Sequence, residues 1–344
     1  MSMAKSALSP PSLNLIQSPI PWLRAFWKFS RPHTLVGTSL SVLGLFAIAW
    51  ATRYPAGVSP GTFHVWQGVS ALWLTWLACM CTNIYIVGLN QIEDVAADRV
   101  TKPYLPIASG EFSAPQAKML VGIACSGAIL LAVVSQSIYL LGTVCLSLAI
   151  GTAYSLPPLQ LKRFPLLGPL CKLLVRGAVA NLGIFLHAAS QLGLLRPQVP
   201  GRVWVLTLLV LVFSGAIALL KALRDNQTYS IGGLTGPMIL KLVWWLLTVC
   251  YASLIIAAMV IPGINAPFFM VTHGLALMYF WYLSHQVQPL SDDTEAPQLS
   301  CQEHDEDDMG AQKLSCQEYF QFVWKLFFIE YLIFPTACLL HQMG

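Results

Sequence analysis

The sequence predicts an all-α integral membrane protein, a bundle of about nine transmembrane helices. The 344 residues are 56% hydrophobic and only 10% charged, and the mean hydropathy is +0.65. A soluble domain carries about 25% charged residues. The apolar residues also collect into runs of the length that a helix needs to cross a bilayer, roughly 20 residues. The bilayer is therefore the expected solvent for most of the chain.

Nine such runs follow one another along the chain. The third and fourth are nearly continuous, and the segment Ser135-Gln136-Ser137 predicts a tight turn between them. The expected spans are residues 34–51, 66–89, 117–136, 137–154, 167–189, 203–220, 236–261, 265–285 and 320–340.

Residues 30–344 are expected to form one transmembrane domain, preceded by a disordered and interfacial tail, residues 1–29. This tail lacks the apolar region of a signal peptide, and the aromatic and basic residues between Pro21 and Trp27 suit the headgroup level of a membrane. Residues 290–318 hold nine of the 15 acidic residues. Their polar composition predicts a disordered cytoplasmic insert.

The distribution of basic residues predicts the orientation in the membrane. If the amino end is cytoplasmic and each run crosses once, sixteen of the 19 Lys and Arg residues lie on the cytoplasmic side. This bias is the one that the positive-inside rule describes. It accounts for the net charge of +4, so no nucleic-acid partner is expected.

Acidic side chains are rare outside the insert, and several gather where the second run ends. Asn90, Asp94 and Asp98 are spaced i, i+4, i+8, which places three oxygen ligands on one face of a helix. Carboxylates near a membrane are costly and usually functional. Because Mg²⁺ typically takes one or two carboxylates together with phosphate oxygens, the pattern predicts catalytic metal ligands for a magnesium-bridged diphosphate.

Basic residues on the same side of the membrane are candidates for binding that diphosphate. Lys and Arg can neutralise a leaving diphosphate, although each could also be a snorkelling residue at the membrane boundary. The candidates are Arg99, Lys102, Lys162, Arg163, Arg176, Lys221 and Arg224.

The segment from Asn90 to Gly110 resembles the first aspartate-rich motif of the UbiA superfamily of intramembrane prenyltransferases. Its ending, Lys-Pro-Tyr-Leu-Pro-x-Ala-Ser-Gly, is most similar to the homogentisate prenyltransferase branch. The likeness continues through Tyr154-Ser155, Lys162-Arg163-Phe164, Arg176, His187 and Trp324-Lys-Leu-Phe-Phe-Ile-Glu330-Tyr331. The resemblance implies nine helices around a central lipid-accessible cavity, Mg²⁺ as cofactor and an isoprenyl diphosphate as substrate.

The second motif of that superfamily is eroded in this chain. The branch has a pattern like Lys-Asp-x-x-Asp-x-Glu-Gly-Asp, whereas this chain reads Lys-Ala-Leu-Arg-Asp-Asn-Gln-Thr-Tyr from Lys221 to Tyr229. Asp225 is the acid that remains, and it is the fourth expected catalytic metal ligand. The resemblance then implies a second magnesium that is held weakly or is partly replaced by Arg224 and Lys221.

Three functions follow from these features. The first is Mg²⁺-dependent ionisation of an isoprenyl diphosphate, farnesyl or geranylgeranyl, with transfer of the prenyl group to an aromatic, phenolic acceptor. The second is a terpene cyclase that uses the same diphosphate without an acceptor. The third is a non-catalytic relative or a transporter. Transfer ranks first because it is commoner in the superfamily. We expect a multi-pass protein of the endoplasmic reticulum, in contact with membrane lipid and with its active site on the cytoplasmic side.

Overall fold

The computed structural model describes residues 13–54, 62–194, 197–224, 234–287 and 314–343. Within these residues the chain is helical and has no β-strand. The elements in chain order are α1 (Pro19–Phe29), α2 (Pro32–Arg53), α3 (Thr62–Glu93), α4 (Val95–Thr101), α5 (Ala114–Val134), α6 (Ile138–Ser155), the 3₁₀ turn η1 (Leu161–Arg163), α7 (Leu167–Leu173), the π-helical turn η2 (Leu174–Val179), α8 (Ala180–Gln191), α9 (Gly201–Arg224), α10 (Gly236–Ala257), α11 (Ala266–Ser284) and α12 (Cys316–Met343).

Nine stretches of the described residues are long and apolar enough to cross a membrane, which confirms the predicted number of spans. Elements α7, η2 and α8 run on from one another and together form the fifth span, Leu167–Gln191. The predicted turn between the third and fourth spans is also present. Helix α5 ends at Val134, α6 begins at Ile138, and Gln136 between them has a positive φ of 52°.

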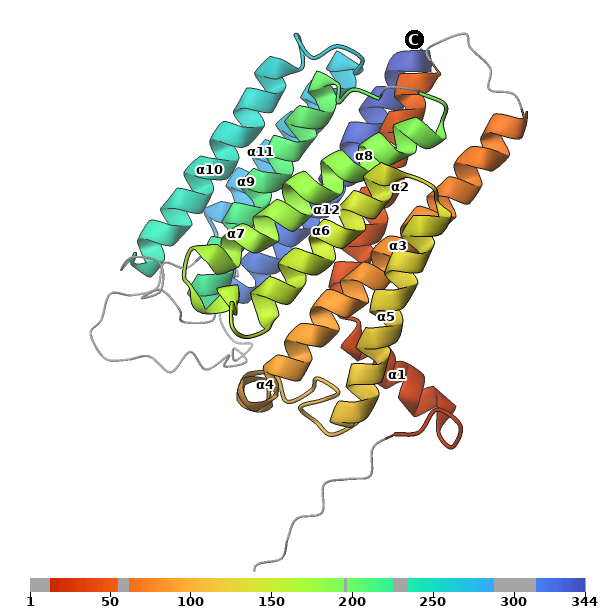
Figure 1. Ribbon diagram of the computed structural model, residues 1–344. Helices are drawn as coiled ribbons and strands as arrows, with labels where there is room; N and C mark the ends of the chain where they lie inside the picture. Colours follow the sequence, from red (N-terminus) through yellow and green to blue (C-terminus); the bar gives the residue numbers. More distant parts are fainter. Residues whose placement is uncertain (1–12, 55–61, 195–196, 225–233, 288–313, 344) are drawn as a thin grey trace, which may run out of the picture.

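The long helices form a bundle whose interior is apolar (Figure 1). Helix α3 packs along α5, α2 packs along α12 and α8, and α10 packs against α9 and α11. The largest cluster of buried apolar side chains contains residues of α2 and α3 and of the five helices α8, α9, α10, α11 and α12. Two smaller clusters hold α1, α3 and α5 together at one end and α3, α5 and α6 farther along.

The two segments that we expected to be disordered are partly helical. Residues 19–29 of the predicted tail form α1, whose buried Ala25 and Phe29 pack against the bundle. Residues 316–318 of the predicted insert are the first residues of α12. A reciprocal cap explains this start, because Ser315 N donates to Glu318 Oε2 at 2.9 Å and Glu318 N donates to Ser315 Oγ at 3.2 Å. The rest of the insert, residues 290–313, lies outside the described residues.

The short elements α1, α4 and η1 lie at the same end of the bundle (Figure 1). The opposite end holds Arg53 and Arg202, and Arg202 donates to Thr52 Oγ1 at 2.8 Å and to the Gly263 carbonyl at 2.7 Å. The acidic motif therefore belongs to the end where the sequence places most of the positive charge.

A glycine contact at the crossing of α2 and α12 generates a test of this packing. A Cβ added at Gly44 would lie 2.9 Å from the Tyr331 carbonyl oxygen and 3.1 Å from Pro335 Cγ, whereas one added at Gly122 meets nothing within 4 Å. Because a backbone atom cannot swing aside, we expect Gly44→Ala to cost about 1–3 kcal/mol and to lower the thermal unfolding midpoint in detergent.

The matched control is Gly122→Ala, which should leave the midpoint unchanged or raise it slightly, since alanine favours a helix over glycine by about 1 kcal/mol. Equal midpoints for the two variants would show that α2 and α12 do not approach as closely as described.

Candidate active site

The three predicted oxygen ligands lie along an elbow between α3 and α4. Asn90 is in the last turn of α3, Asp94 is the junction residue with φ −103° and ψ 15°, and Asp98 is in α4. Helical hydrogen bonds continue through the elbow, from Asp94 N to Asn90 O at 3.0 Å and from Asp98 N to Asp94 O at 2.8 Å. The i, i+4, i+8 register is therefore kept although the helix bends, and the three side chains remain near one another.

Each carboxylate of the elbow is paired with a lysine. Lys162 from η1 places its Nζ 2.5 Å from Asp94 Oδ1, and Lys102 places its Nζ 3.0 Å from Asp98 Oδ1. Asn90 Nδ2 donates to the other oxygen of Asp94 at 2.7 Å. The elbow is therefore a compact acidic face whose counter-charges are two predicted diphosphate-binding residues.

The elbow fits the ligand preference of magnesium. The Asp98 side chain is only 5% exposed, and its Oδ2 has no hydrogen-bond partner among the described residues. An unpaired buried carboxylate oxygen is costly and is a natural ligand for a hard cation. No group of three or more His, Cys, Asp or Glu gathers in the described part of the chain. Asn90 and substrate phosphate oxygens would therefore have to complete the coordination.

A second group of cations lies around the His33 imidazole at the start of α2. Arg31, Arg176, Lys221 and Arg224 are all close enough to interact with this ring electrostatically. They come from three separate regions of the chain: the connection before α2, the π-helical turn η2 and the last turn of α9. Four cations around one imidazole make this region strongly attractive to an anion.

Aromatic side chains of α12 hold two of these guanidinium groups. Arg176 Cζ lies 4.8 Å from the ring centre of Trp324 and 5.7 Å from that of Phe327, and Arg224 Cζ lies 4.5 Å from that of Phe320. Cation–π contacts of this kind orient a guanidinium without neutralising its charge. No carboxylate of the described residues lies within 4 Å of Arg176, so its donors are available to an anionic ligand.

Arg31 connects the acidic and the basic groups. Tyr154, at the end of α6, interacts electrostatically with Asp94, Lys162 and Arg31, while Arg31 also interacts with His33. Arg31 has a positive φ of 52°, a conformation that non-glycine residues adopt mainly where the surrounding structure holds them. We therefore treat the elbow and the cations around His33 as two halves of one site.

The remaining predicted residues differ in position. Arg99 and Arg163 are exposed, and neither side chain forms a hydrogen bond or an ion pair with Asn90, Asp94 or Asp98, so the structure does not bring them to the elbow. The reason for Arg99 is its register, because it follows Asp98 by one residue and points to another face of α4. Asp225 lies outside the described residues, so its role as a metal ligand stays a prediction.

Sequence reasoning missed Arg31 and His33 as site residues. They stand in the segment Arg31-Pro32-His33, directly before the first predicted span. The signal in the sequence is a pair of basic residues at the start of a span, at the end of the bundle that holds the acidic motif. That signal is weak, because basic residues at span ends are ordinary in membrane proteins.

Comparison with known proteins decides the family. The model of the UbiA prenyltransferase family matches residues 44–300. The chain belongs to this family. It is 40% identical over 326 residues to a homogentisate phytyltransferase of Synechocystis, covering 92% of this chain and 96% of that protein. It is 33% identical to homogentisate phytyltransferase 1 of Arabidopsis thaliana, covering 91% of this chain and 75% of the relative.

Solved structures show the same fold for this UbiA-family protein. A UbiA homologue from Archaeoglobus fulgidus, solved with geranyl diphosphate and Mg²⁺, matches with a TM-score of 0.55 at 14% identity, covering 93% of this chain and all of the other. A digeranylgeranylglyceryl phosphate synthase matches with a TM-score of 0.56 at 16% identity, covering 92% of this chain and 98% of the other. At these identities the likeness establishes the fold alone.

The comparisons also bear on location. They support a multi-pass membrane protein, but they do not support the endoplasmic reticulum that we expected. The Arabidopsis relative is described as chloroplastic, and the relative at 40% identity comes from Synechocystis.

A third polar cluster lies deeper in the bundle, and its side chains are buried and bonded to one another. Glu330 on α12 accepts a hydrogen bond from Tyr251 at 2.9 Å and lies 3.1 Å from His273 Nε2. His273 Nδ1 is 2.7 Å from the Phe269 carbonyl, which can only accept, so Nδ1 carries a proton. One further proton must lie between Nε2 and Glu330. The cluster thus cross-links α10, α11 and α12.

Removing this carboxyl should test its structural role. We expect Glu330→Leu to cost about 3–5 kcal/mol, because it leaves His273 and Tyr251 unpaired in an apolar core. Glu330→Gln should cost far less, since its amide can still accept from Tyr251 and donate to a neutral His273. Thermal unfolding in detergent distinguishes the two variants, and equal stability of both would contradict a cross-linking role.

Proposed function

We propose that this UbiA-family protein catalyses Mg²⁺-dependent transfer of a prenyl group from an isoprenyl diphosphate to an aromatic acid of the homogentisate type. One observation carries the proposal: the Asn90–Asp94–Asp98 elbow faces cations from other parts of the chain. An oxygen-ligand face next to basic side chains is the arrangement that a metal-bridged diphosphate requires.

The elbow would hold the donor. When bound, magnesium would withdraw charge from the diphosphate and make it a better leaving group. Asn90, Asp94 and Asp98 would hold the metal, and Lys162 and Lys102, which lie against these carboxylates, would bind phosphate oxygens of the diphosphate. Arg31 interacts electrostatically with His33 and with Tyr154 and would bind the same anion.

The cations around His33 would receive the acceptor. Two curated relatives are named for homogentisate, which is a phenol that bears a carboxylate. The Arg176 guanidinium can form a two-pronged hydrogen bond with a carboxylate, and it lies against the Trp324 ring. An acceptor held there would present an electron-rich ring toward the prenyl group at the elbow.

For the donor we propose a 20-carbon chain. Relatives that this chain resembles over at least 90% of its length are named phytyltransferases and geranylgeranyltransferases, and one is named a solanesyltransferase; the first two names denote 20-carbon chains and include the relative at 40% identity. Asp225 would contribute to a second metal position, with Lys221 and Arg224 supplying part of its charge. We further propose a photosynthetic membrane as the location, from the sources of the relatives.

Terpene cyclisation is the weaker alternative. The relatives at 30–40% identity are named as transferases to homogentisate. Arg176, which we place at the carboxylate of the acceptor, would have no such carboxylate to bind in cyclisation, because that reaction needs no anionic acceptor.

The elbow can be tested by removing its ligands. Asp94→Ala and Asp98→Ala should each lower prenyl transfer by at least about 100-fold, the scale of losing a key electrostatic group in an active site. Glu93→Ala is the matched control, because Glu93 is exposed on another face and should leave turnover intact. Transfer that survives in the Asp94→Ala/Asp98→Ala double variant would contradict the proposed metal site.

The reaction type can be tested with substrates. Membranes that contain the protein, supplied with geranylgeranyl diphosphate and Mg²⁺, should form a prenylated product only after homogentisate is added. Arg176→Gln should raise the KM for homogentisate more than the KM for the diphosphate, since we place Arg176 at the carboxylate. Release of a hydrocarbon without any acceptor would instead indicate cyclisation.

A further inference from the structure

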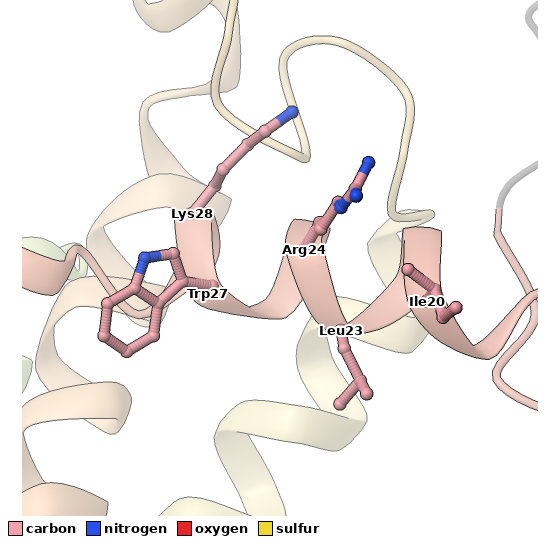
Figure 2. A pocket seen from close by; sticks show the side chains of 5 residues that line it. All are labelled: Ile20, Leu23, Arg24, Trp27 and Lys28. Atoms are coloured by element: carbon pink, nitrogen blue, oxygen red, sulfur yellow. The ribbon is translucent and has the colours of Figure 1, made fainter.

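The outer face of α1 carries an open groove that the proposed reaction does not use. The groove has a volume of about 440 Å³ and is lined by Ile20, Leu23, Arg24, Trp27 and Lys28. Figure 2 shows these five side chains on one stretch of helix. Ile20, Leu23 and Trp27 are 63%, 56% and 56% exposed, which is unusual for large apolar side chains that meet water.

The inner face of the same helix is fixed to the bundle. Phe29 is fully buried, and its ring lies 5.8 Å from that of Phe112, which also lies 5.6 Å from Trp22. Gln91, the neighbour of Asn90, donates a hydrogen bond of 2.7 Å to the Phe29 carbonyl. The exposed apolar residues therefore belong to a docked helix and cannot turn inward.

Two cations border the apolar lining. Arg24 and Lys28 are one helical turn apart, and Figure 2 shows both side chains extending in the same direction, away from Leu23. Lys28 Nζ pairs with Glu111 Oε1 at 2.8 Å, but the lysine side chain is still 44% exposed. No carboxylate of the described residues lies within 4 Å of Arg24. The groove thus joins an apolar surface to a positive edge.

The position of α1 places this groove at a membrane boundary. The helix lies at the end of the bundle where α3 bends into α4 and α5 begins (Figure 1). A helix with an apolar side and a basic side lies in the plane of the interface, and its basic residues attract anionic lipid.

We propose that the α1 groove binds an anionic phospholipid of the surrounding bilayer. An acyl chain would lie along Ile20, Leu23 and Trp27, and the headgroup phosphate would contact Arg24 and Lys28. Bound lipid would also steady the site, because α1 leads directly into Arg31 and Lys28 is tied to the segment after Lys102. That consequence rests on the proposed function, whereas lipid binding itself does not.

The test measures lipid binding without substrates. The full-length protein is reconstituted in vesicles of phosphatidylcholine and phosphatidylglycerol, and spin-labelled versions of both lipids report which one contacts the protein. The wild type should favour phosphatidylglycerol. An exposed basic residue near an anionic surface contributes about fivefold in affinity, so Arg24→Gln/Lys28→Gln should reduce the preference by about fivefold or more.

Two variants serve as controls. Lys241→Gln removes an exposed cation from the second turn of α10 and should leave the preference unchanged. Arg24→Lys keeps the charge and should also retain it, which guards against a general folding defect. An unchanged preference in Arg24→Gln/Lys28→Gln would overturn the proposal. An equal loss in Lys241→Gln would do so too, because the preference would then reflect overall positive charge.

Discussion

The ion pair between Lys162 and Asp94 joins parts of the chain that are 68 residues apart. Lys162 comes from the short turn after α6, and Asp94 is the junction of α3 and α4. In an apolar bundle neither charge is tolerated alone near the membrane. The pair therefore fixes where the two connections meet, and Tyr154 interacts electrostatically with both of its charges. The geometry of the candidate site depends on this contact.

The two halves of the site have opposite electrostatic character for a physical reason. The elbow is acidic, so it suits a cation, and the surroundings of His33 are basic, so they suit an anion. Aromatic rings of α12 lie against the guanidinium groups of Arg176 and Arg224. A donor that carries metal would then bind at the elbow, and an acceptor that carries a carboxylate would bind near His33. Neither ligand would suit the other position.

The helices around the site are held by close packing and by buried polar contacts. Gly44 allows α2 to approach the backbone of α12, and α12 supplies Trp324 and Phe320 to the cationic half. Glu330 binds the same helix to α10 and α11. Small residues and buried hydrogen bonds are the usual means of helix association in a bilayer, where apolar side chains gain little from leaving lipid. The position of α12 therefore determines which aromatic rings the Arg176 guanidinium contacts.

The sequence by itself determined the nine spans, the turn at Gln136, the acidic register from Asn90 to Asp98 and the family. These features depend on composition and on spacing within a few helical turns, which the linear chain records. The tertiary structure adds that Lys162 reaches Asp94, that His33 lies near cations from three parts of the chain, and that Arg99 and Arg163 form no ion pair with the elbow. The physical reason is that these contacts are made between helices far apart in the sequence, where the packing of whole faces determines which side chains meet.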